Sequence, residues 1–451
     1  MECGKRIHKY SLNGKNIVLD INSGAVHLVD GITYLILDYY KNNTLEEIIE
    51  LLKDKYDKKD IVGSYDEIKT LETEGLLYSK ESDIDIKYNE ENIIKALCLH
   101  VAHDCNLRCN YCFASQGDFK GDRSLMTLDV GKRALEFLVE NSGNRRNLEV
   151  DFFGGEPLMN FDLVKELVSY GRELEKNYNK HFRFTITTNG VLLDEDKIEF
   201  INENMDNVVL SLDGRKEVND NMRKTISGEG SYDIIFPKFQ KMIDKRGDKD
   251  YYIRGTFTGY NLDFSKDILD FYNKGLKKTS VEPVVTSPDK DYAIKEEDLG
   301  IILEEYERFS KDYIEIKKKD KDFLFFHFMI DLKQGPCLVK RAVGCGAGSE
   351  YMAVTPQGDL YPCHQFVGDE KFKIGDVFKG IENTEIRKEF KKANVYNKSE
   401  CRDCWARFYC SGGCHANAYN HHKDIMKPYE IGCEMEKKRI ECAISVLANL
   451  D

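Results

Sequence analysis

The sequence predicts an α/β protein built around a partial barrel of six βα units, a (β/α)6 TIM-type barrel, with a smaller domain on either side. Six apolar or β-branched runs alternate with helical segments over about residues 95–320, which indicates parallel strands joined by right-handed crossovers. Residues 1–85 show short strands followed by helices. Residues 330–451 contain most of the 14 cysteines and few long periodic segments, so we expect metal to hold this part together.

Bulk composition excludes some functions. A chain of 451 residues with 41% hydrophobic and 32% charged residues is typical of a soluble protein of about three domains. No apolar run approaches the roughly 18 residues of a membrane helix, and the first residues lack the apolar core of a secretory signal. We therefore expect a cytoplasmic protein with no membrane partner. The net charge of -13 argues against nucleic acid as a partner, because phosphate binding needs lysine and arginine.

The first 30 residues predict antiparallel strands. The segment "IHKYSLNGKNIVLDINSGAVHLV" alternates apolar and polar positions. The pairs Asn13-Gly14 and Ser23-Gly24 mark tight turns between strands.

Helices are expected next. Thr44 and Glu47 form a capping box ahead of "LEEIIELLKDKY", and a second amphipathic stretch runs from Asp60 to Gly75. The following "LLYS" is expected to return as a strand. This order predicts a compact, winged-helix-like domain over residues 1–85; a purely structural cap is the alternative.

Six runs predict the strands of the barrel, and each of the first four ends in an unusual motif. The runs are "ALCLHVAH", "LEVDFFGG", "FRFTITTNG", "NVVLSLDG", "YYIRGTFT" and "KTSVEPVVT". A three-cysteine loop follows the first, and "GGEP", "TTNG" and "SLDG" end the next three. Because barrel chemistry gathers where the strands end, these motifs should share one face.

The three-cysteine loop is "CNLRCNYC", residues 105–112. In a reducing compartment, clustered cysteines suggest metal or catalysis rather than disulfides. Three thiolates from Cys105, Cys109 and Cys112 can each hold one iron of a 4Fe-4S cluster, which leaves the fourth iron open to a small molecule. An incomplete zinc site is the alternative.

The spacing C-x-x-x-C-x-aromatic-C after the first strand of such a barrel resembles the radical S-adenosylmethionine (SAM) superfamily, with Tyr111 in the aromatic place. The resemblance implies that the amino and carboxylate groups of SAM chelate the fourth iron. An electron from the cluster then splits SAM to give a 5'-deoxyadenosyl radical. Cys105, Cys109 and Cys112 would be the catalytic cluster ligands.

The motif "GGEP" resembles the segment of that family that holds the methionine amino group of SAM. Gly154 and Gly155 would let backbone carbonyls approach, and Glu156 would accept a hydrogen bond from the ammonium. Taken alone, a glycine pair after a strand is an ordinary turn.

Two further motifs complete the implied SAM site. Ser211 of "SLDG" and Arg223 of "DNMRK" resemble the pair that meets the ribose and the methionine carboxylate, for which an arginine fork is suited. Thr188 and Asn189 of "TTNG" are expected to line the same pocket. The alternative for Arg223 is a solvated surface charge.

The C-terminal cysteines resemble the SPASM extension, which binds two further 4Fe-4S clusters in related enzymes. Their spacing is C345-x12-G358-x4-C363, then C401-x2-C404-x5-C410-x3-C414, then Cys433. The resemblance assigns an outer cluster to Cys401, Cys404, Cys410 and Cys433, and an inner cluster to Cys345, Cys363 and Cys414. A zinc site is the alternative for such a tail.

Four cysteines lie outside these sets. Cys337 either supplies a fourth ligand to the inner cluster or stands aside, which would leave an open iron for a substrate thiolate. Cys3, Cys98 and Cys442 belong to no motif and are expected to be small buried hydrophobes.

Barrel and tail together also resemble sulfatase-maturing SPASM enzymes. Those enzymes carry an aspartate after the cysteine that here is Cys363, whereas this chain has His364. His364 is a candidate general base by position, or an ordinary surface histidine.

The N-terminal domain resembles the leader-peptide recognition element of ribosomal-peptide maturases. Nearly the whole chain resembles the maturase of six-cysteine (SCIFF) peptides. The resemblance implies three 4Fe-4S clusters, SAM, a precursor peptide bound through its leader, and an electron donor such as ferredoxin or flavodoxin.

The implied reaction is an intramolecular thioether between a cysteine sulfur and the α-carbon of an acceptor residue. The alternatives are epimerisation, a carbon-carbon crosslink or sulfatase-type maturation, and, from another class, a zinc-stabilised binding protein.

Overall fold

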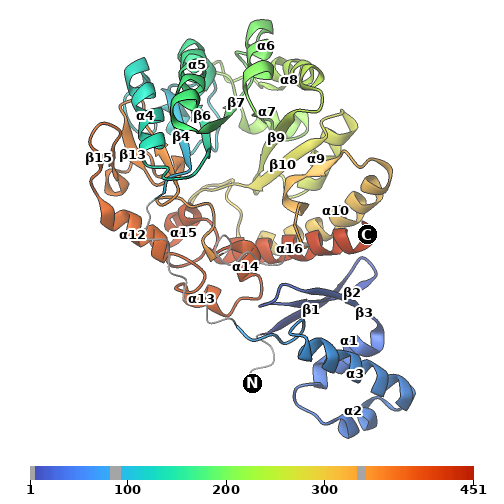
Figure 1. Ribbon diagram of the computed structural model, residues 1–451. Helices are drawn as coiled ribbons and strands as arrows, with labels where there is room; N and C mark the ends of the chain where they lie inside the picture. Colours follow the sequence, from blue (N-terminus) through green and yellow to red (C-terminus); the bar gives the residue numbers. More distant parts are fainter. Residues whose placement is uncertain (1–5, 82–92, 333–341, 451) are drawn as a thin grey trace.

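The computed structural model describes residues 6–81, 93–332 and 342–450. Cys3 and Cys337 lie outside the described residues. Figure 1 shows the N-terminal sheet and helices in blue below, the barrel in cyan to yellow above, and the C-terminal part in orange and red alongside.

The N-terminal part is a three-stranded antiparallel sheet followed by three helices. The strands lie in the order β1-β2-β3; they are β1 (Ile7–Leu12), β2 (Lys15–Asp20) and β3 (Val26–Val29). The predicted hairpin turn is confirmed, because Asn13 and Gly14 both have positive φ angles, of 50° and 77°. The helices are α1 (Gly31–Tyr39), α2 (Leu45–Leu52) and α3 (Lys58–Thr73).

The capping box is also confirmed: Thr44 and Glu47 exchange side chain to backbone hydrogen bonds at the start of α2. The strand expected at "LLYS" is wrong. Gly75 and Tyr78 have φ angles of 71° and 52°, so the chain turns there, and Leu77 and Tyr78 are buried against the helices instead of pairing with a strand.

Six parallel strands form the barrel, as the six apolar runs predict. In sheet order they are β4 (Ala96–His103), β6 (Asn147–Gly154), β7 (His181–Thr188), β8 (Asn207–Ser211), β9 (Asp250–Phe257) and β10 (Lys278–Pro283). Short strands β5 (Ser124–Leu125) and β11 (Leu324–Phe325) pair with β4 and β10.

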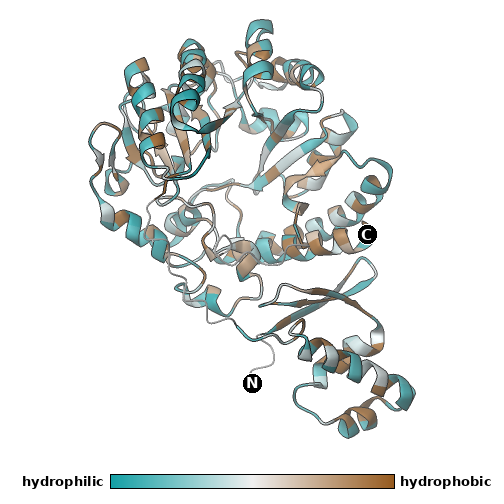
Figure 2. Cartoon of the chain, in the orientation of Figure 1, coloured by the Kyte–Doolittle hydropathy of each residue, from teal (hydrophilic) through white to brown (hydrophobic). Residues whose placement is uncertain are grey.

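Helices cover the outside of this sheet (Figure 1). They are α4 (Leu128–Glu140), α5 (Phe161–Tyr178), α6 (Glu195–Asn204), α7 (Lys216–Met222), α8 (Tyr232–Arg246), α9 (Phe264–Asn273) and α10 (Leu299–Lys319). Alternate residues of each strand face them: Leu148, Val150 and Phe152 of β6 are at most 1% exposed. Figure 2 shows hydrophilic residues on these helices interrupted by hydrophobic ones, as expected for helices with one buried face.

The C-terminal part extends the barrel sheet. β12 (Tyr351–Val354) pairs in parallel with β4, and β13 (Asp359–Tyr361), β14 (Gly375–Asp376) and β15 (Gly380–Ile381) follow antiparallel. The sequence pattern did not predict these strands. The helices are α12 (Thr384–Lys392), α13 (Ser399–Arg402), α14 (Arg407–Cys410), α15 (His415–His422) and α16 (Glu430–Leu450).

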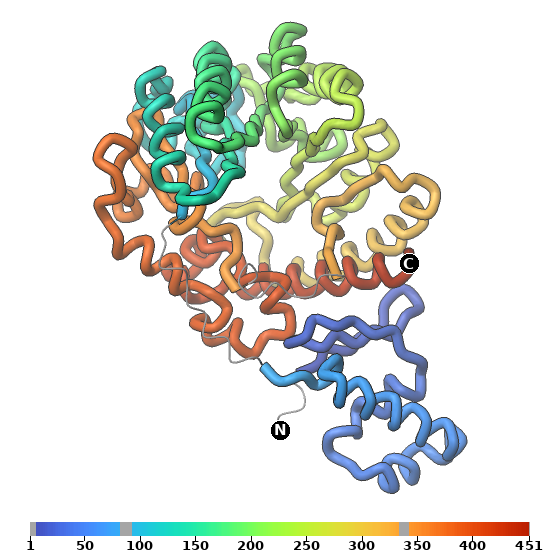
Figure 3. Tube along the Cα trace, viewed as in Figure 1, coloured from blue at the N-terminus to red at the C-terminus, as the bar shows by residue number. Residues whose placement is uncertain are grey.

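Helix α16 joins the three parts of the molecule. It packs along α10 and across β1 and β2, and Figure 3 shows it running between the blue N-terminal sheet and the barrel. Ile440 and Ile444 of α16 contact Ile17 and Leu19 of β2. No helix in the described part of the chain has the length and apolar character needed to cross a membrane.

Candidate active site

The three-cysteine loop leaves β4 at the end where the barrel strands finish. Hydrogen bonds attach it to the segment after α7: the Arg108 amide donates to the Lys224 carbonyl at 2.7 Å, and the Asn110 amide to the Met222 carbonyl at 2.8 Å. Arg223 therefore lies beside the loop, as the implied SAM site requires.

Burial raises the pKa of two thiols of the loop, that of Cys105 to about 12 and that of Cys109 to about 11. Apolar surroundings disfavour a free thiolate. Coordination to a metal deprotonates a thiol outright.

Gly154 and Gly155 bring the "GGEP" segment against the end of β4, where the three-cysteine loop begins. A Cβ at Gly154, whose φ is 131°, would lie 2.2 Å from the Ala102 carbonyl oxygen, and one at Gly155 would lie 2.2 Å from that of Asp104. The Gly155 and Glu156 amides donate to these two oxygens at 2.8 Å. The glycines thus permit a close approach between two protein loops, which the sequence analysis did not anticipate.

Glu156 brings three predicted positions together. Its carboxylate is 1% exposed and accepts hydrogen bonds from the Thr188 hydroxyl at 2.7 Å and the Asn189 amide at 2.8 Å. The Leu158 amide is a third donor, at 3.1 Å. Burial raises the pKa of this carboxyl, and within the described residues no cation forms an ion pair with it. A buried carboxylate with about four acceptor positions retains one for an ammonium group.

Tyr111 and Arg223 meet at Asp213, a residue that the sequence analysis passed over. The Tyr111 hydroxyl donates to the Asp213 carboxylate at 2.7 Å and accepts from Arg223 Nη1 at 2.8 Å. Burial raises the pKa of Asp213 to about 6 against the opposing effect of Arg223. Asp213 stands in "SLDG", just past the end of β8. A carboxylate at the end of a barrel strand is typical of a functional residue, and this signal could have identified Asp213 from the sequence.

Arg223 keeps a donor free. Its Nε is buried and has no hydrogen-bond partner among the described residues, and an orphaned guanidinium N–H is costly unless a ligand satisfies it. Together with the acceptor at Glu156, this donor fits the carboxylate and ammonium ends of one amino acid.

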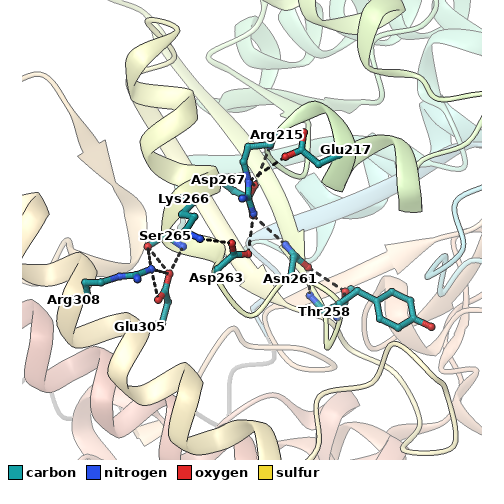
Figure 4. A network of polar contacts seen from close by, with 11 residues as sticks. Arg215, Glu217, Thr258, Asn261, Asp263, Ser265, Lys266, Asp267, Glu305 and Arg308 are labelled. Atoms are coloured by element: carbon teal, nitrogen blue, oxygen red, sulfur yellow. Dashed lines mark hydrogen bonds and ion pairs between the residues drawn. The ribbon is translucent and has the colours of Figure 1, made fainter.

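A network outside the barrel anchors the loop that carries Asp213 (Figure 4). Arg215 donates to Asp267 and to Asp263, each at 2.8 Å. Gly214, with a φ of 149°, leaves room for this arrangement, because a Cβ there would lie 2.3 Å from the Asp267 carboxyl group.

A cavity of about 310 Å³ lies inside the barrel beside these groups. Ser211, Tyr111 and Arg223 line it, as do Arg254 and Glu282, which form an ion pair at 3.0 Å. His364 also lines the cavity and accepts from or donates to the Tyr351 hydroxyl at 3.2 Å. His364 is therefore an interior residue, and burial lowers its pKa to about 4.

The tail thiols gather in two places. A cavity of about 760 Å³ is lined by all four cysteines of the outer set, Cys401, Cys404, Cys410 and Cys433. The buried Lys398 ammonium lies near them and donates to the Gly412 carbonyl at 2.8 Å.

In the inner set, burial and the nearby thiols of Cys414 and Cys345 raise the pKa of Cys363. A second cavity of about 260 Å³, lined by Cys410, Cys414 and Cys433, lies between the two sets. No three His, Cys, Asp or Glu side chains of the described ranges converge closely enough to hold a single metal ion.

Comparison with known proteins agrees with this geometry. Residues 99–272 match the model of the Radical SAM superfamily, and residues 345–405 match that of SPASM, an iron-sulfur cluster-binding domain. The fold and site thus define an iron-sulfur protein that uses SAM. The chain therefore carries a radical SAM domain and a SPASM domain.

Several curated proteins are similar over much of the chain. A cysteine-type anaerobic sulfatase-maturating enzyme from Clostridium novyi is 28% identical over 70% of this chain and 86% of its own length. The radical SAM cyclopropyl synthase TigE from Paramaledivibacter caminithermalis is 21% identical over 95% of this chain and 92% of its own.

Two solved structures share the fold. The AdoMet-bound anSMEcpe has a TM-score of 0.64 at 22% identity and covers 79% of this chain and 99% of its own. Streptococcus suis SuiB bound to S-adenosylmethionine has a TM-score of 0.53 at 17% identity and covers 95% of this chain and 99% of its own.

Proposed function

We propose that this chain is a peptide maturase that forms thioether crosslinks, from a cysteine sulfur to an α-carbon, in a six-cysteine (SCIFF) precursor peptide made on the ribosome. One observation carries the proposal. The match covers 99% of the anSMEcpe chain but only 79% of this chain, so about a fifth of this chain has no counterpart there. SuiB covers nearly all of it, and one SuiB structure is described as bound to its precursor peptide SuiA.

The barrel residues would hold SAM. In this assignment Cys105, Cys109 and Cys112 would ligate the first 4Fe-4S cluster, which with SAM would supply a 5'-deoxyadenosyl radical for removal of a hydrogen atom from the acceptor carbon. Glu156, which holds three protein donors, would accept a further hydrogen bond from the ammonium group of SAM. Arg223 Nε, which has no partner among the described residues, would donate to the carboxylate of SAM. Ser211 lies where it can meet the ribose.

The tail would hold two further 4Fe-4S clusters, on the outer and the inner thiol sets. The inner set has three cysteines among the described residues, and an unfilled fourth position would suit a substrate thiolate. When that sulfur bonds to the carbon radical, one electron is left over, and this cluster would accept it. An electron donor such as ferredoxin or flavodoxin would supply the reducing electron.

The N-terminal domain would bind the leader of the precursor. Within the described ranges β3 pairs on one side only, with β2, and Leu28 on it is 52% exposed. An extended peptide can add to such an edge as a further strand. We propose domain limits of 1–85 for this domain, 95–320 for the barrel and 330–451 for the SPASM domain.

The experiment is anaerobic reconstitution followed by reaction with SAM, a reductant and a six-cysteine precursor peptide. A thioether predicts a product lighter by two hydrogens in which one cysteine resists alkylation. An unchanged mass with an inverted α-carbon would indicate epimerisation. Loss of two hydrogens with every cysteine still alkylated would indicate a carbon-carbon crosslink. Either result would overturn the thioether assignment.

A further inference from the structure

Polar and charged side chains line cavities at both ends of the barrel interior. A second cavity, of about 400 Å³, is lined by Glu149, Arg183, Asn207 and Asp250, which stand at or near the starts of their strands. The 310 Å³ cavity of the candidate active site is lined by residues near the strand ends. Because the strands are parallel, these two cavities, here called the lower and the upper cavity, lie at opposite ends of the barrel.

The two cavities meet at two side chains. Asp151, in the middle of β6, and Tyr351, at the start of β12, line both of them. Closed βα barrels are normally filled by layers of branched apolar side chains. A carboxylate and a phenol at the junction are therefore unusual, and they indicate a function rather than packing.

The neighbours of Asp151 can pass or hold a proton. The Thr187 hydroxyl of β7 donates to Asp151 Oδ1 at 3.3 Å. On the other side, Cys98 of β4 is the register partner of Asp151 and is hydrogen-bonded to the Tyr351 hydroxyl. The Tyr351 hydroxyl lies 3.2 Å from His364 Nδ1 in the upper cavity.

Charged groups face Asp151 from both cavities, and some of them already form ion pairs with other residues. In the upper cavity Arg254 is paired with Glu282 at 3.0 Å. In the lower cavity Asp250 is paired with Lys278 at 3.1 Å; Glu149 and Arg183 also face this cavity.

Asp151 forms no ion pair with any described residue. Burial raises its pKa to about 7, and the hydrogen bond from Thr187 and the more distant Arg254 only partly oppose this. A carboxyl group of this kind can both take up and release a proton near neutral pH.

We propose that Asp151 carries a proton through the barrel: it accepts the proton that the substrate thiol loses in the upper cavity and releases it to solvent through the lower cavity. This inference rests on the proposed function, because thioether formation requires the thiol to lose a proton. In this step the S–H bond breaks, an O–H bond forms on the Asp151 carboxylate, and the electron pair stays on sulfur. Release into the lower cavity restores the carboxylate.

The test compares Asp151→Asn with the wild type. The variant keeps the shape of the side chain but cannot take up a proton. We expect thioether formation to slow by about 100-fold or more and to lose its dependence on pH near 7. Cleavage of SAM to 5'-deoxyadenosine in the absence of peptide should continue at the wild-type rate. Asp162→Asn is the matched control, since this carboxylate is exposed on α5 and lines neither cavity, and it should retain the wild-type rate.

A second measurement is independent of the reaction. Infrared difference spectra recorded across about pH 6 to 8 should contain the carbonyl stretch of one protonated carboxyl group that Asp151→Asn lacks. If no such band titrates, or if Asp151→Asn makes thioether with the wild-type rate and pH profile, Asp151 is not the carrier. A wild-type enzyme that makes no thioether while the band titrates would instead refute the proposed reaction.

Discussion

At the scale of single residues, the candidate SAM site is an arrangement of opposite buried charges. Among the residues that the structure describes, Glu156 presents an acceptor that no cation contacts, and Arg223 presents an Nε donor that no acceptor meets. Each alone is unfavourable in a buried position. A zwitterionic ligand that meets both removes the two costs at once, so tight SAM binding is expected from these two groups.

Arg223→Lys should weaken SAM binding. A lysine has no planar fork and cannot donate both to Tyr111 and to a carboxylate in the same geometry. Loss of a charge-assisted hydrogen bond of about 1.5–3 kcal/mol corresponds to a rise in the dissociation constant of roughly 10-fold or more. Equilibrium binding of SAM to the reconstituted protein measures this. Arg133→Lys on the exposed face of α4 is the control, and equal affinity in both variants would contradict the assignment.

The sequence motifs pointed to residues that the structure brings together in the candidate site, but not to the contacts among them. Thr188 and Asn189 stand at the end of β7 and Glu156 follows β6, and the structure joins them through hydrogen bonds. Asp213 and Asp151 were not foreseen. Their environments depend on which side chains the barrel brings opposite them, and a single strand does not encode its neighbours.

At the scale of elements, the sequence pattern predicted the N-terminal strands and the six barrel strands but not the strands of the C-terminal part. The six strands of the barrel follow their apolar runs because one face of each packs against helices. β12 spans four residues, Tyr351–Val354, which is too short to show a period. Its place is fixed by the open edge of β4, a feature of the folded sheet rather than of the local sequence.

Gly214 positions the loop that carries Asp213, so Gly214→Ala should harm both stability and SAM binding. The new Cβ would collide with the Asp267 carboxyl group and the backbone would be strained, at a cost of about 1–3 kcal/mol. Denaturant midpoints and SAM affinity measure the two effects.

Gly300→Ala in α10 provides the control for this substitution. Its Cβ would meet nothing within 4 Å. The free energy of unfolding should therefore stay constant or rise by up to about 1 kcal/mol, and the denaturant midpoint should follow it. Similar midpoints for the two variants would show that the Gly214 loop tolerates a side chain.

The edge of β3 gives a test of leader recognition. Leu28→Asp places a charge on this edge and should weaken binding of the precursor peptide by at least about fivefold, or ~1 kcal/mol. Leu51→Asp on α2 is the matched control, because the two leucines are 52% and 54% exposed. Fluorescence anisotropy of a labelled peptide measures both, and an equal loss in the two variants would rule out the β3 edge.

At the scale of the whole molecule, the N-terminal domain lies against the outer thiol set. His8 of β1 stacks on Trp405, the residue after Cys404, with ring centroids 3.7 Å apart, and it pairs with Glu441 of α16 at 2.8 Å. Arg407 reaches back to Asn22 at 2.8 Å. The domain that would bind a leader is thus packed directly on the region that would hold the outer cluster.

The separation of the three thiol sets makes the metal content of the whole chain predictable set by set. The reconstituted wild type should hold about twelve irons, four for each cluster. The triple variant with alanine at Cys105, Cys109 and Cys112 should lose about four irons and all reductive cleavage of SAM, because the tail sets stand on other elements. Alanine at Cys401 and Cys404 should remove about four irons and leave SAM cleavage intact.

Cys442→Ala provides the control. This buried thiol of α16 lies outside all three sets, so the variant should retain the full iron content. Iron and sulfide analysis with electron paramagnetic resonance measures these contents. A wild type that takes up zinc but no iron would refute the cluster assignment for the whole chain.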